Sequence, residues 1–282
     1  MEIIISISSC RCLIWEVRIY LEVGHNLIET VFLHDGTLDG IFTAVYDGFV
    51  LKKSMYGDRY KDNIAVACKH NYVPSLFCNY IEVETDEDKA GKTVNHIVKV
   101  MGIDAYDTAM GVACHFSEEA GEVLFGFLVR GFKVGKGITA MLTDKYAVRA
   151  FERSRKAYNE SHLMREFLRF TDVGGNLYAK IEPKCNIVHM MCNHFADRFP
   201  GENWIIYDSV HHVVAVHPKY QKWFLTDDVG VDYEKIDKAT QDGYVDLWKL
   251  FVDTIAIEER RNERCQNNHM PKWYRKNMTE WK

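Results

Sequence analysis

Residues 165–199 read REFLRFTDVGGNLYAKIEPKCNIVHMMCNHFADRF, and this stretch decides the fold of the second half of the chain. Its first part, Phe167–Asp172, is an aromatic, alternating run that is typical of a β-strand. Gly174 and Gly175 supply the positive φ angles that a two-residue hairpin turn requires, and Leu177–Ile181 returns as the second strand. The stretch therefore predicts a β-hairpin.

A helix is predicted directly after this hairpin, because the apolar residues from Asn186 onward recur with a period near 3.6. One face of this helix carries Val188, Met191, Cys192, Phe195 and Phe199. His194 and Arg198 are four residues apart on its flank, where they can share a site with Arg169 and Asp172 of the hairpin. We expect an ion pair between Arg198 and Asp172 that buttresses the hairpin.

Composition and charge limit the classes of protein to which the chain can belong. Of its 282 residues, 47% are hydrophobic and 13% are aromatic, which indicates a globular chain with a substantial core. The net charge of -5 excludes a globally basic nucleic-acid-binding protein, so any such surface must be a local patch. The eight cysteines are irregularly spaced and no secretory signal precedes them, so we expect reduced thiols in a cytoplasmic protein.

Residues 1–28 form an N-terminal extension to the rest of the sequence. Their apolar run is interrupted by Glu2, Arg11, Glu16 and Arg18, so it has the pattern of neither a signal peptide nor a membrane span. Two interpretations remain open at this point. The extension is either an extra pair of strands that packs on the body of the protein, or the result of a start codon assigned too early.

The pattern of the whole chain predicts an α+β fold, in which a helical N-terminal half precedes a small antiparallel sheet flanked by helices. Residues 29–165 form the mainly helical part, with a strand at 30–33 and loops and short strands over 51–81. The helices of this part are expected to begin at polar caps, namely Thr37 or Asp39, Thr85, Ser117 and Asp144.

Residues 166–282 form the α+β part. Strands at 204–208, 213–216 and 222–226 are expected to make a meander beside the hairpin. An acidic loop over 227–238 then leads into a helix with an apolar stripe. We expect this helix to bury Tyr244, Leu247, Trp248, Phe251 and Ile255.

Basic residues gather in two regions of the sequence. On the helix that begins at Asp144, the residues Ala147, Val148, Phe151 and Tyr158 are expected to form the apolar face, opposite Lys145, Arg149, Arg153 and Lys156. The C-terminal tail interleaves basic residues with Trp273, Tyr274 and Trp281. A DNA-binding surface is one interpretation, because guanidinium and ammonium groups bind phosphate and aromatic rings stack on bases. A solvated basic face, with rings that pin the tail to the body, is the other.

Several segments together carry a resemblance to a known family. These segments are FLHDGTLDGIFTAVYDGF (32–49), GFKVGK (131–136), LRFTDVGGNLYAKIEP (168–183), HFADRF (194–199), DTIAIEERRN (253–262) and MPKWYRKNMTEWK (270–282). The chain resembles, over residues 29–282, the DNA metabolism and DNA repair family that contains the domain of unknown function DUF4130. Relatives in that family begin near Thr30, which favours the early-start interpretation of the extension. The exchanged places of Trp273 and Arg275 depart from the family pattern.

The resemblance implies a bacterial cytoplasmic protein of DNA metabolism or DNA repair. It also implies association with a radical S-adenosylmethionine protein that modifies or repairs DNA, and some relatives continue into a uracil-DNA glycosylase domain. We therefore expect a DNA-binding or adaptor module that works with such a partner and needs no cofactor or metal of its own. The DNA-binding residues expected are Arg149, Arg153, Lys156, Arg165, Arg169, Lys272, Arg275 and Lys276.

Two alternatives for the function stay open. A metal-dependent, nuclease-like enzyme would use Asp172 and Glu182 as metal ligands, Lys184 beside the attacking water and His194 as an acid or base. Lys184 departs from the family pattern, which weakens this hypothesis. A module that binds only other proteins would use the apolar faces instead.

A zinc site is a further hypothesis. Cys185, His189 and Cys192 project toward one flank of the predicted helix. Structural zinc requires four ligands, and the sequence offers no evident fourth, so buried thiols beside a histidine are the better interpretation.

Overall fold

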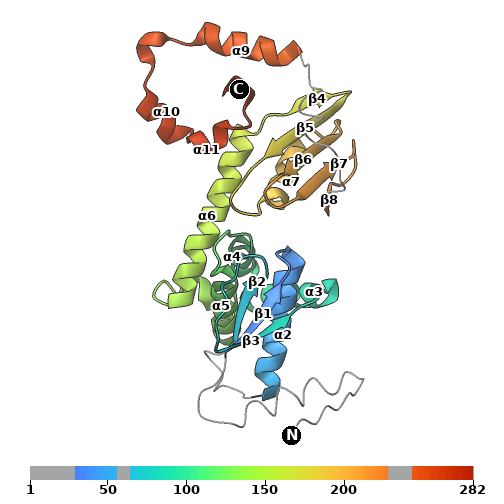
Figure 1. Ribbon diagram of the computed structural model, residues 1–282, viewed down its shortest axis with the longest axis vertical. Helices are drawn as coiled ribbons and strands as arrows, with labels where there is room; N and C mark the ends of the chain where they lie inside the picture. The colour runs from blue at the N-terminus through green and yellow to red at the C-terminus, as the bar shows by residue number, and fades with distance from the viewer. Residues whose placement is uncertain (1–28, 56–63, 228–242, 282) are drawn as a thin grey trace. The chain divides into compact units, whose positions relative to one another are not determined.

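The computed structural model describes residues 29–55, 64–227 and 243–281 (Figure 1). The sequence-based expectations for residues 1–28, and for most of the acidic loop at 227–238, lie outside the described residues. The chain divides into two compact units, of which the first comprises Met1–Ala109 with Ser117–Val148 and the second comprises Met110–Phe116 with Arg149–Lys282. The longer segment of the second unit begins at Arg149, within a continuous helix, and the parts 29–165 and 166–282 that the sequence suggested stay a prediction.

The first unit is built on a three-stranded parallel sheet in the order β2-β1-β3. The central strand β1 (Glu29–His34) pairs with β2 (Ile64–Cys68) on one side and with β3 (Cys78–Glu82) on the other. Five of the six residues of β1 are buried, as is usual for a parallel strand that is covered on both faces. The short strands expected within 51–81 are thus β2 and β3. The helices of this unit are α2 (Leu38–Met55), α3 (Glu87–Met101), the first part of α4 (Ile103–Ala113) and α5 (Ala120–Val134), followed by a 3-10 helix (Gly135–Ala140).

The cap of α3 differs from the one that the sequence predicted. Asp86, not Thr85, is the N-cap, and its side chain accepts a hydrogen bond of 3.0 Å from the amide of Lys89. Thr85 instead donates its hydroxyl to Asp35 over 2.7 Å, which places it in the loop that follows β3. The pattern of polar residues predicted the helix but not which of two adjacent residues caps it.

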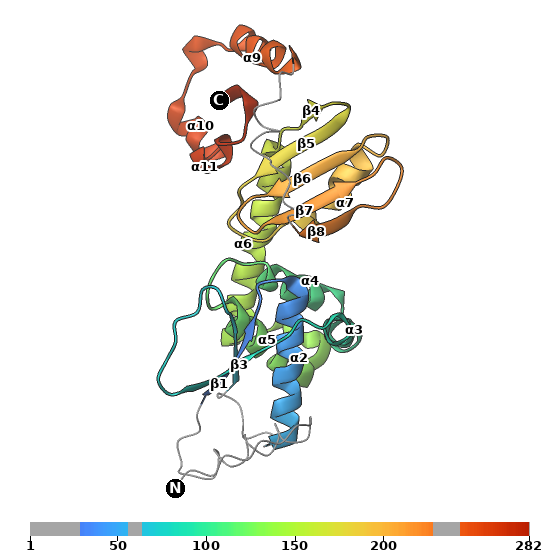
Figure 2. The same cartoon turned by 45° about the vertical axis from the view of Figure 1, so that its right-hand side comes forward.

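The second unit is organised around a five-stranded sheet in the order β4-β5-β6-β7-β8 (Figure 2). Its elements in chain order are α6 (Lys145–Phe167, in this unit from Arg149 on), β4 (Thr171–Val173), β5 (Asn176–Ile181), α7 (Val188–Arg198), β6 (Trp204–Asp208), β7 (Val213–His217) and β8 (Phe224–Asp227). Gly174 and Gly175 have φ angles of 61° and 84°, which confirms the predicted hairpin turn between β4 and β5.

The prediction of an antiparallel sheet was wrong in one respect. Strands β5 and β6 pair in parallel, whereas the other three pairings of this sheet are antiparallel. A parallel pair needs a crossover connection, and α7 supplies it between these two strands. The sheet is therefore mixed, and α7 packs on one of its faces.

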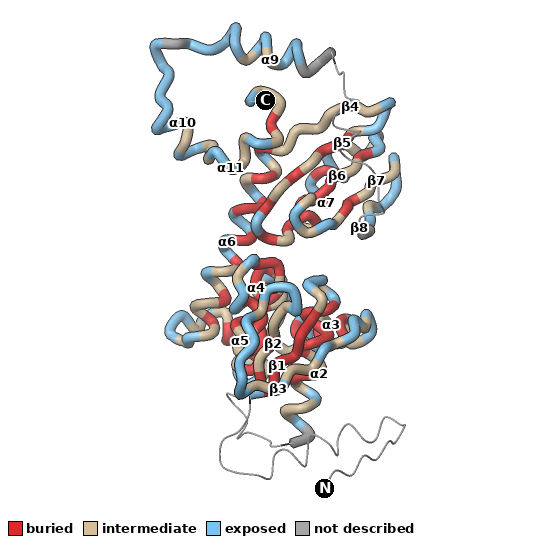
Figure 3. Tube along the Cα trace, in the orientation of Figure 1, coloured by how far each residue is buried: buried red, intermediate tan, exposed pale blue. Residues whose placement is uncertain are grey.

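The core of the second unit lies between α7 and the sheet (Figure 3). Val188, Met191, Cys192 and Phe195 are buried along α7, which confirms the predicted helix face. The ring of Phe195 lies 6.4 Å from the ring of Trp204 on β6, and Trp204 is fully buried. A smaller cluster, made of Tyr178, Tyr207 and Val214, covers the opposite face of the sheet.

The buried face of α6 also differs from the prediction. Tyr158 was expected in the core but is 37% exposed, whereas small residues are buried. These residues are Ala147, Ala150, Ser154, Ala157 and Ser161. Gly111 of α4 lies directly against Ser154, where a Cβ atom on the glycine would clash. The close approach of the two helices therefore selects small side chains rather than large apolar ones.

The C-terminal segment begins with α9 (Gly243–Ile255) and continues through shorter helices, the last of which is a 3-10 helix at Thr279–Trp281. The predicted burial of α9 was wrong, because its apolar side chains are exposed. Leu247, Trp248, Phe251 and Ile255 are 61%, 41%, 50% and 58% exposed, and the side chain of Tyr244 lies outside the described residues. Within the described residues, no helix is both long and apolar enough to cross a membrane.

Candidate functional site

A cavity of about 640 Å³ opens in the second unit between the C-terminal end of α6 and the helix α7. The residues that line it come from α6, from the short segment that joins α6 to β4, and from α7 and the residue after it. They are His162, Arg165, Glu166, Leu168, Arg169, Phe170, His194, Phe195, Arg198 and Phe199. We call this the arginine cavity.

Helical spacing explains why these side chains meet. His162, Arg165 and Glu166 are three and four residues apart on α6, so they lie on one face of its last turns. His194 and Arg198 are four apart on α7 and lie together in the same way. Both residues are exposed, whereas the neighbouring Phe195 is buried and packs near Trp204 of the sheet, which orients α7.

The lining of the cavity is positive. Three arginines face Glu166, and Glu280 pairs with Arg169, which leaves one positive charge in excess when both histidines are neutral. Glu166 is 3.2 Å from His162 in an exposed contact. Arg165 donates from Nε to the carbonyl of Ser161 over 3.3 Å.

Arg169 is held more firmly than the other two arginines. Its Nη2 lies 2.8 Å from Oε1 of Glu280, and its Nη1 donates to the carbonyls of Glu166 and Leu168. Burial raises the pKa of Glu280, but the hydrogen bond and the charge of Arg169 outweigh burial, so the pKa lies below its usual value. Glu280 is therefore ionised at neutral pH, and the C-terminal segment is tied to the cavity wall.

The surroundings of His194 lower its pKa. Burial lowers its pKa, and the charges of Arg165 and Arg198 lower it further. A neutral imidazole can donate one hydrogen bond and accept another, so His194 adds a polar group to the cavity without adding charge.

Aromatic rings form the apolar side of the cavity. Phe170 meets Phe195 and Phe199 edge-on, at centroid distances of 5.2 Å and 5.7 Å. The guanidinium carbon of Arg198 lies 5.6 Å from the centroid of the Phe199 ring. The cavity thus combines cations at one side with half-buried rings at the other.

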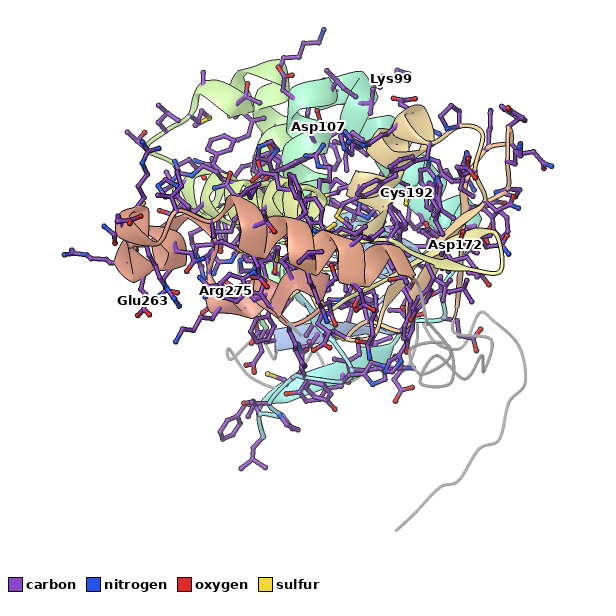
Figure 4. All side chains as sticks on the ribbon, turned by 90° about the horizontal axis from the view of Figure 1, so that it is seen from above. Lys99, Asp107, Asp172, Cys192, Glu263 and Arg275 are labelled. Carbon is purple, nitrogen blue, oxygen red and sulfur yellow. The ribbon has the colours of Figure 1, made fainter. Side chains whose placement is uncertain are left out.

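Three of the four residues that the sequence placed near one another do meet here, namely Arg169, His194 and Arg198, and Arg165 joins them. Asp172 does not join them. Its Oδ1 accepts the amide hydrogen of Gly175 over 2.7 Å, which closes the hairpin turn. Within the described residues, Arg198 and Asp172 form no ion pair, because the turn itself engages the carboxylate. Figure 4 shows Asp172 on the hairpin, well separated from Arg275 of the C-terminal segment.

The candidate metal ligands of the nuclease hypothesis are far apart. Asp172 pairs with Leu177, and Glu182 follows the end of β5 five residues later. At about 3.3 Å per residue this separates the two carboxylates by roughly 16 Å along the strand, too far to hold one ion. Glu182 forms an ion pair with Lys276 instead, and the amino group of Lys184 lies over the ring of Trp273.

The geometry of the side chains does not fit the zinc hypothesis. Cys192 donates its thiol to the carbonyl of Val188, and His189 approaches Cys114 at 3.8 Å rather than Cys185 or Cys192. Burial lowers the pKa of His189 to about 4 and raises the pKa of Cys192 to about 12, so the thiol stays protonated. No group of three or more histidine, cysteine or acidic side chains in the described part of the chain is arranged to hold a metal.

The other basic residues expected to bind DNA lie outside the cavity. Successive residues of an α-helix are rotated by roughly 100° around the helix axis, so the side-chain directions of Arg149 and Arg165 differ by about 160°. These two residues therefore point to opposite sides of α6. Arg153 and Lys156 lie on the side of Arg149. We call Arg149, Arg153 and Lys156 the outer basic face, which is distinct from the arginine cavity.

The basic residues of the C-terminal segment mostly hold that segment in place. Arg275 donates to Asn267 over 2.8 Å, and its guanidinium lies 4.2 Å from the centroid of the Trp281 ring. Lys276 pairs with Glu182, whereas Lys272 is exposed. This supports the alternative in which basic and aromatic residues pin the tail to the body.

Three residues that shape the site were missed in the sequence. Glu160 is only 8% exposed, and its carboxylate accepts the amides of Lys184 at 2.8 Å and Cys185 at 2.9 Å, which fixes the connection between β5 and α7. His162 could have been found, because its spacing from Glu166 places both on one face. Nothing in the sequence pattern links Glu280 to Arg169.

Comparison with known proteins identifies a family. Residues 118–280 match the family described as a domain of unknown function, DUF4130. The match spans more than half of the 282 residues and includes every residue that lines the arginine cavity. No protein among the curated ones matches the chain. On this match, the chain belongs to the DUF4130 family.

Proposed function

We propose that the chain is a DNA-binding module of DNA metabolism or repair and that it holds DNA in the arginine cavity. The observation that carries this proposal is the convergence of Arg165, Arg169 and Arg198 with the rings of Phe170 and Phe199 in one cavity. Arginine is the side chain best suited to bind phosphate, because its planar guanidinium donates two parallel hydrogen bonds. Aromatic rings stack on bases of any sequence.

The positions of the candidate catalytic groups support binding rather than catalysis. Asp172 lies in the hairpin turn, Glu182 is paired with Lys276, and only His194 belongs to the cavity. General acid–base catalysis needs its groups within hydrogen-bonding reach of one reacting atom. A module that holds DNA for a partner enzyme is the function that this arrangement fits best. The radical S-adenosylmethionine protein expected from the family resemblance stays a prediction for that partner.

Fluorescence anisotropy of labelled oligonucleotides, across roughly 50 to 200 mM salt, tests the DNA-binding proposal. Single-stranded and duplex DNA of the same sequence are titrated with the wild type, with Arg165→Gln/Arg198→Gln, and with Arg149→Gln/Arg153→Gln. We expect the cavity variant to lose most of its affinity and to reduce the slope of log K against log salt by about 2.

The outer-face variant is the matched control, because it removes the same charge from the opposite side of α6. It is expected to retain the greater part of the affinity. Absence of binding by the wild type at the lowest salt concentration would overturn the proposal. Equal losses of DNA affinity in the two variants would show that DNA does not bind preferentially in the cavity.

A further inference from the structure

We propose that the arginine cavity recognises a phosphate monoester carried on a nucleoside, either the phosphorylated end of a DNA strand or a free nucleoside monophosphate. This inference rests on the proposed function and names the part of the DNA that the cavity takes.

The shape of the cavity suits one nucleotide rather than a length of duplex. Its volume of about 640 Å³ lies within the range of roughly 300–1,000 Å³ that is usual for small-molecule sites. Residues of α6 and α7 line it, and Phe195, at 4% exposed, is the buried residue of the lining. The phosphates of a duplex lie on a convex surface, so they would meet the rim of such a cavity and not its interior.

Two arginines of the cavity can bind the oxygens of a dianion, while the formal charge of the cavity, with Glu166 and Glu280 counted, is +1. Within the described residues neither Arg165 nor Arg198 has a carboxylate partner, whereas Arg169 is neutralised by Glu280. Two arginines are therefore available to a ligand. A terminal phosphate monoester carries a charge of about −1.5 to −2 at pH 7, whereas each internal phosphate of a strand carries one negative charge. The monoester matches the two available guanidinium groups.

Arg169, the third arginine, is a fixed part of the cavity lining. Because Glu280 and two backbone carbonyls already hold Arg169, its guanidinium cannot swing toward a ligand without breaking those contacts. Arg165 and Arg198 have fewer constraints, since Arg165 donates only to a backbone carbonyl and Arg198 lies over the Phe199 ring. The side chains of Arg165 and Arg198 are therefore the ones that can move to bind a phosphate.

The apolar wall suits the nucleoside. Phe170 and Phe199 are half-buried, so part of each ring remains available to a base or a sugar. Phe199 lies beneath Arg198, which brings the ring surface next to the phosphate-binding group. His194 is the neutral polar group of the cavity, and it can donate to a phosphate oxygen or to a sugar hydroxyl. A phosphate alone would leave this apolar part of the cavity unused.

The test compares three single-stranded oligonucleotides of one sequence, with a 5′-phosphate, with a 3′-phosphate and with hydroxyl groups at both ends. A competition series adds deoxynucleoside monophosphate, the matching deoxynucleoside and inorganic phosphate. We expect one phosphorylated end to strengthen binding at least about tenfold, which is what one charge-assisted hydrogen bond of about 1.5 kcal/mol would give. Competition by the monophosphate but not by the nucleoside would assign the site to a free nucleotide as well. Absence of such competition would assign it to the strand end.

Two single substitutions test whether the preference for a phosphorylated end depends on the arginine cavity. Arg198→Gln and, separately, Arg165→Gln are expected to abolish the preference for the phosphorylated end, with circular dichroism as the check on folding. Arg149→Gln on the outer basic face is expected to leave that preference intact. Equal affinity of the wild type for phosphorylated and unphosphorylated oligonucleotides would overturn this inference while leaving DNA binding in place. Failure to bind any oligonucleotide would overturn the proposed function as well.

Discussion

Arg169 and Glu280 form an ion pair, with 2.8 Å between Nη2 and Oε1, although they are 111 positions apart in the sequence. Their side chains are 26% and 10% exposed, so solvent screens this pair less than it screens a surface pair. The pair joins the last 3-10 helix of the chain to the wall of the arginine cavity. It also leaves Arg165 and Arg198 as the cavity's available cations.

Glu280→Gln should destabilise the protein by about 1–3 kcal/mol, because it removes the charge that compensates a partly buried guanidinium. Urea unfolding measures this change. Glu166→Gln is the matched control, since the exposed contact of Glu166 with His162 contributes less than about 0.5 kcal/mol. Equal effects of the two substitutions would contradict the structural role of Glu280.

Acid should destabilise the first unit through His34. Burial lowers the pKa of His34 from 6.5 to about 4, partly offset by Asp35, while His70 lowers it further. Its Nδ1 accepts the amide hydrogen of Gly36 over 3.1 Å, and protonation would abolish that acceptor. The unfolded chain binds this proton below pH 6.5 and the folded chain only near pH 4. Stability is therefore lost as the pH falls through this window, by about 3 kcal/mol.

His34→Asn keeps an acceptor near the Gly36 amide but does not titrate. Urea unfolding at several pH values between 6.5 and 4 should give a flatter profile for this variant than for the wild type. A parallel shift of the whole profile, with no change in its slope, would show that His34 is not the group that titrates.

Local patterns predicted local structure well. The Gly174 and Gly175 turn and the buried stripe of α7 depend on neighbouring residues, and both were correct. The gathering of Arg169, His194 and Arg198 followed from the short connection between the hairpin and α7.

Long-range features were not predictable in the same way. The parallel pairing of β5 and β6 depends on how α7 crosses the sheet, which the strand patterns do not encode. The apolar period of α9 showed that it has an apolar face, but not whether anything covers that face. Glu280 was missed because no sequence period relates it to Arg169.

Phe199→Leu should weaken the binding of single-stranded DNA by about 1–3 kcal/mol, because leucine fills space but offers no π-face to a base. The salt dependence of binding should stay unchanged, since no charge is removed. Anisotropy titrations at two salt concentrations separate these effects. A loss of affinity together with a smaller salt slope would indicate that the substitution displaced Arg198, which lies over this ring.

The pKa of His194 should change when a phosphate ligand binds in the cavity. Burial and the charges of Arg165 and Arg198 lower its pKa in the free protein; Asp197 raises it and His162 lowers it. A phosphate bound between the two arginines would offset their charges, so the pKa of His194 should rise on binding. Titration of the histidine ring signals by NMR, with and without deoxynucleoside monophosphate, measures this shift. His34 of the first unit, whose pKa burial lowers to about 4, serves as the internal control and should not change. An unchanged His194 pKa at saturating ligand would place the phosphate away from both arginines.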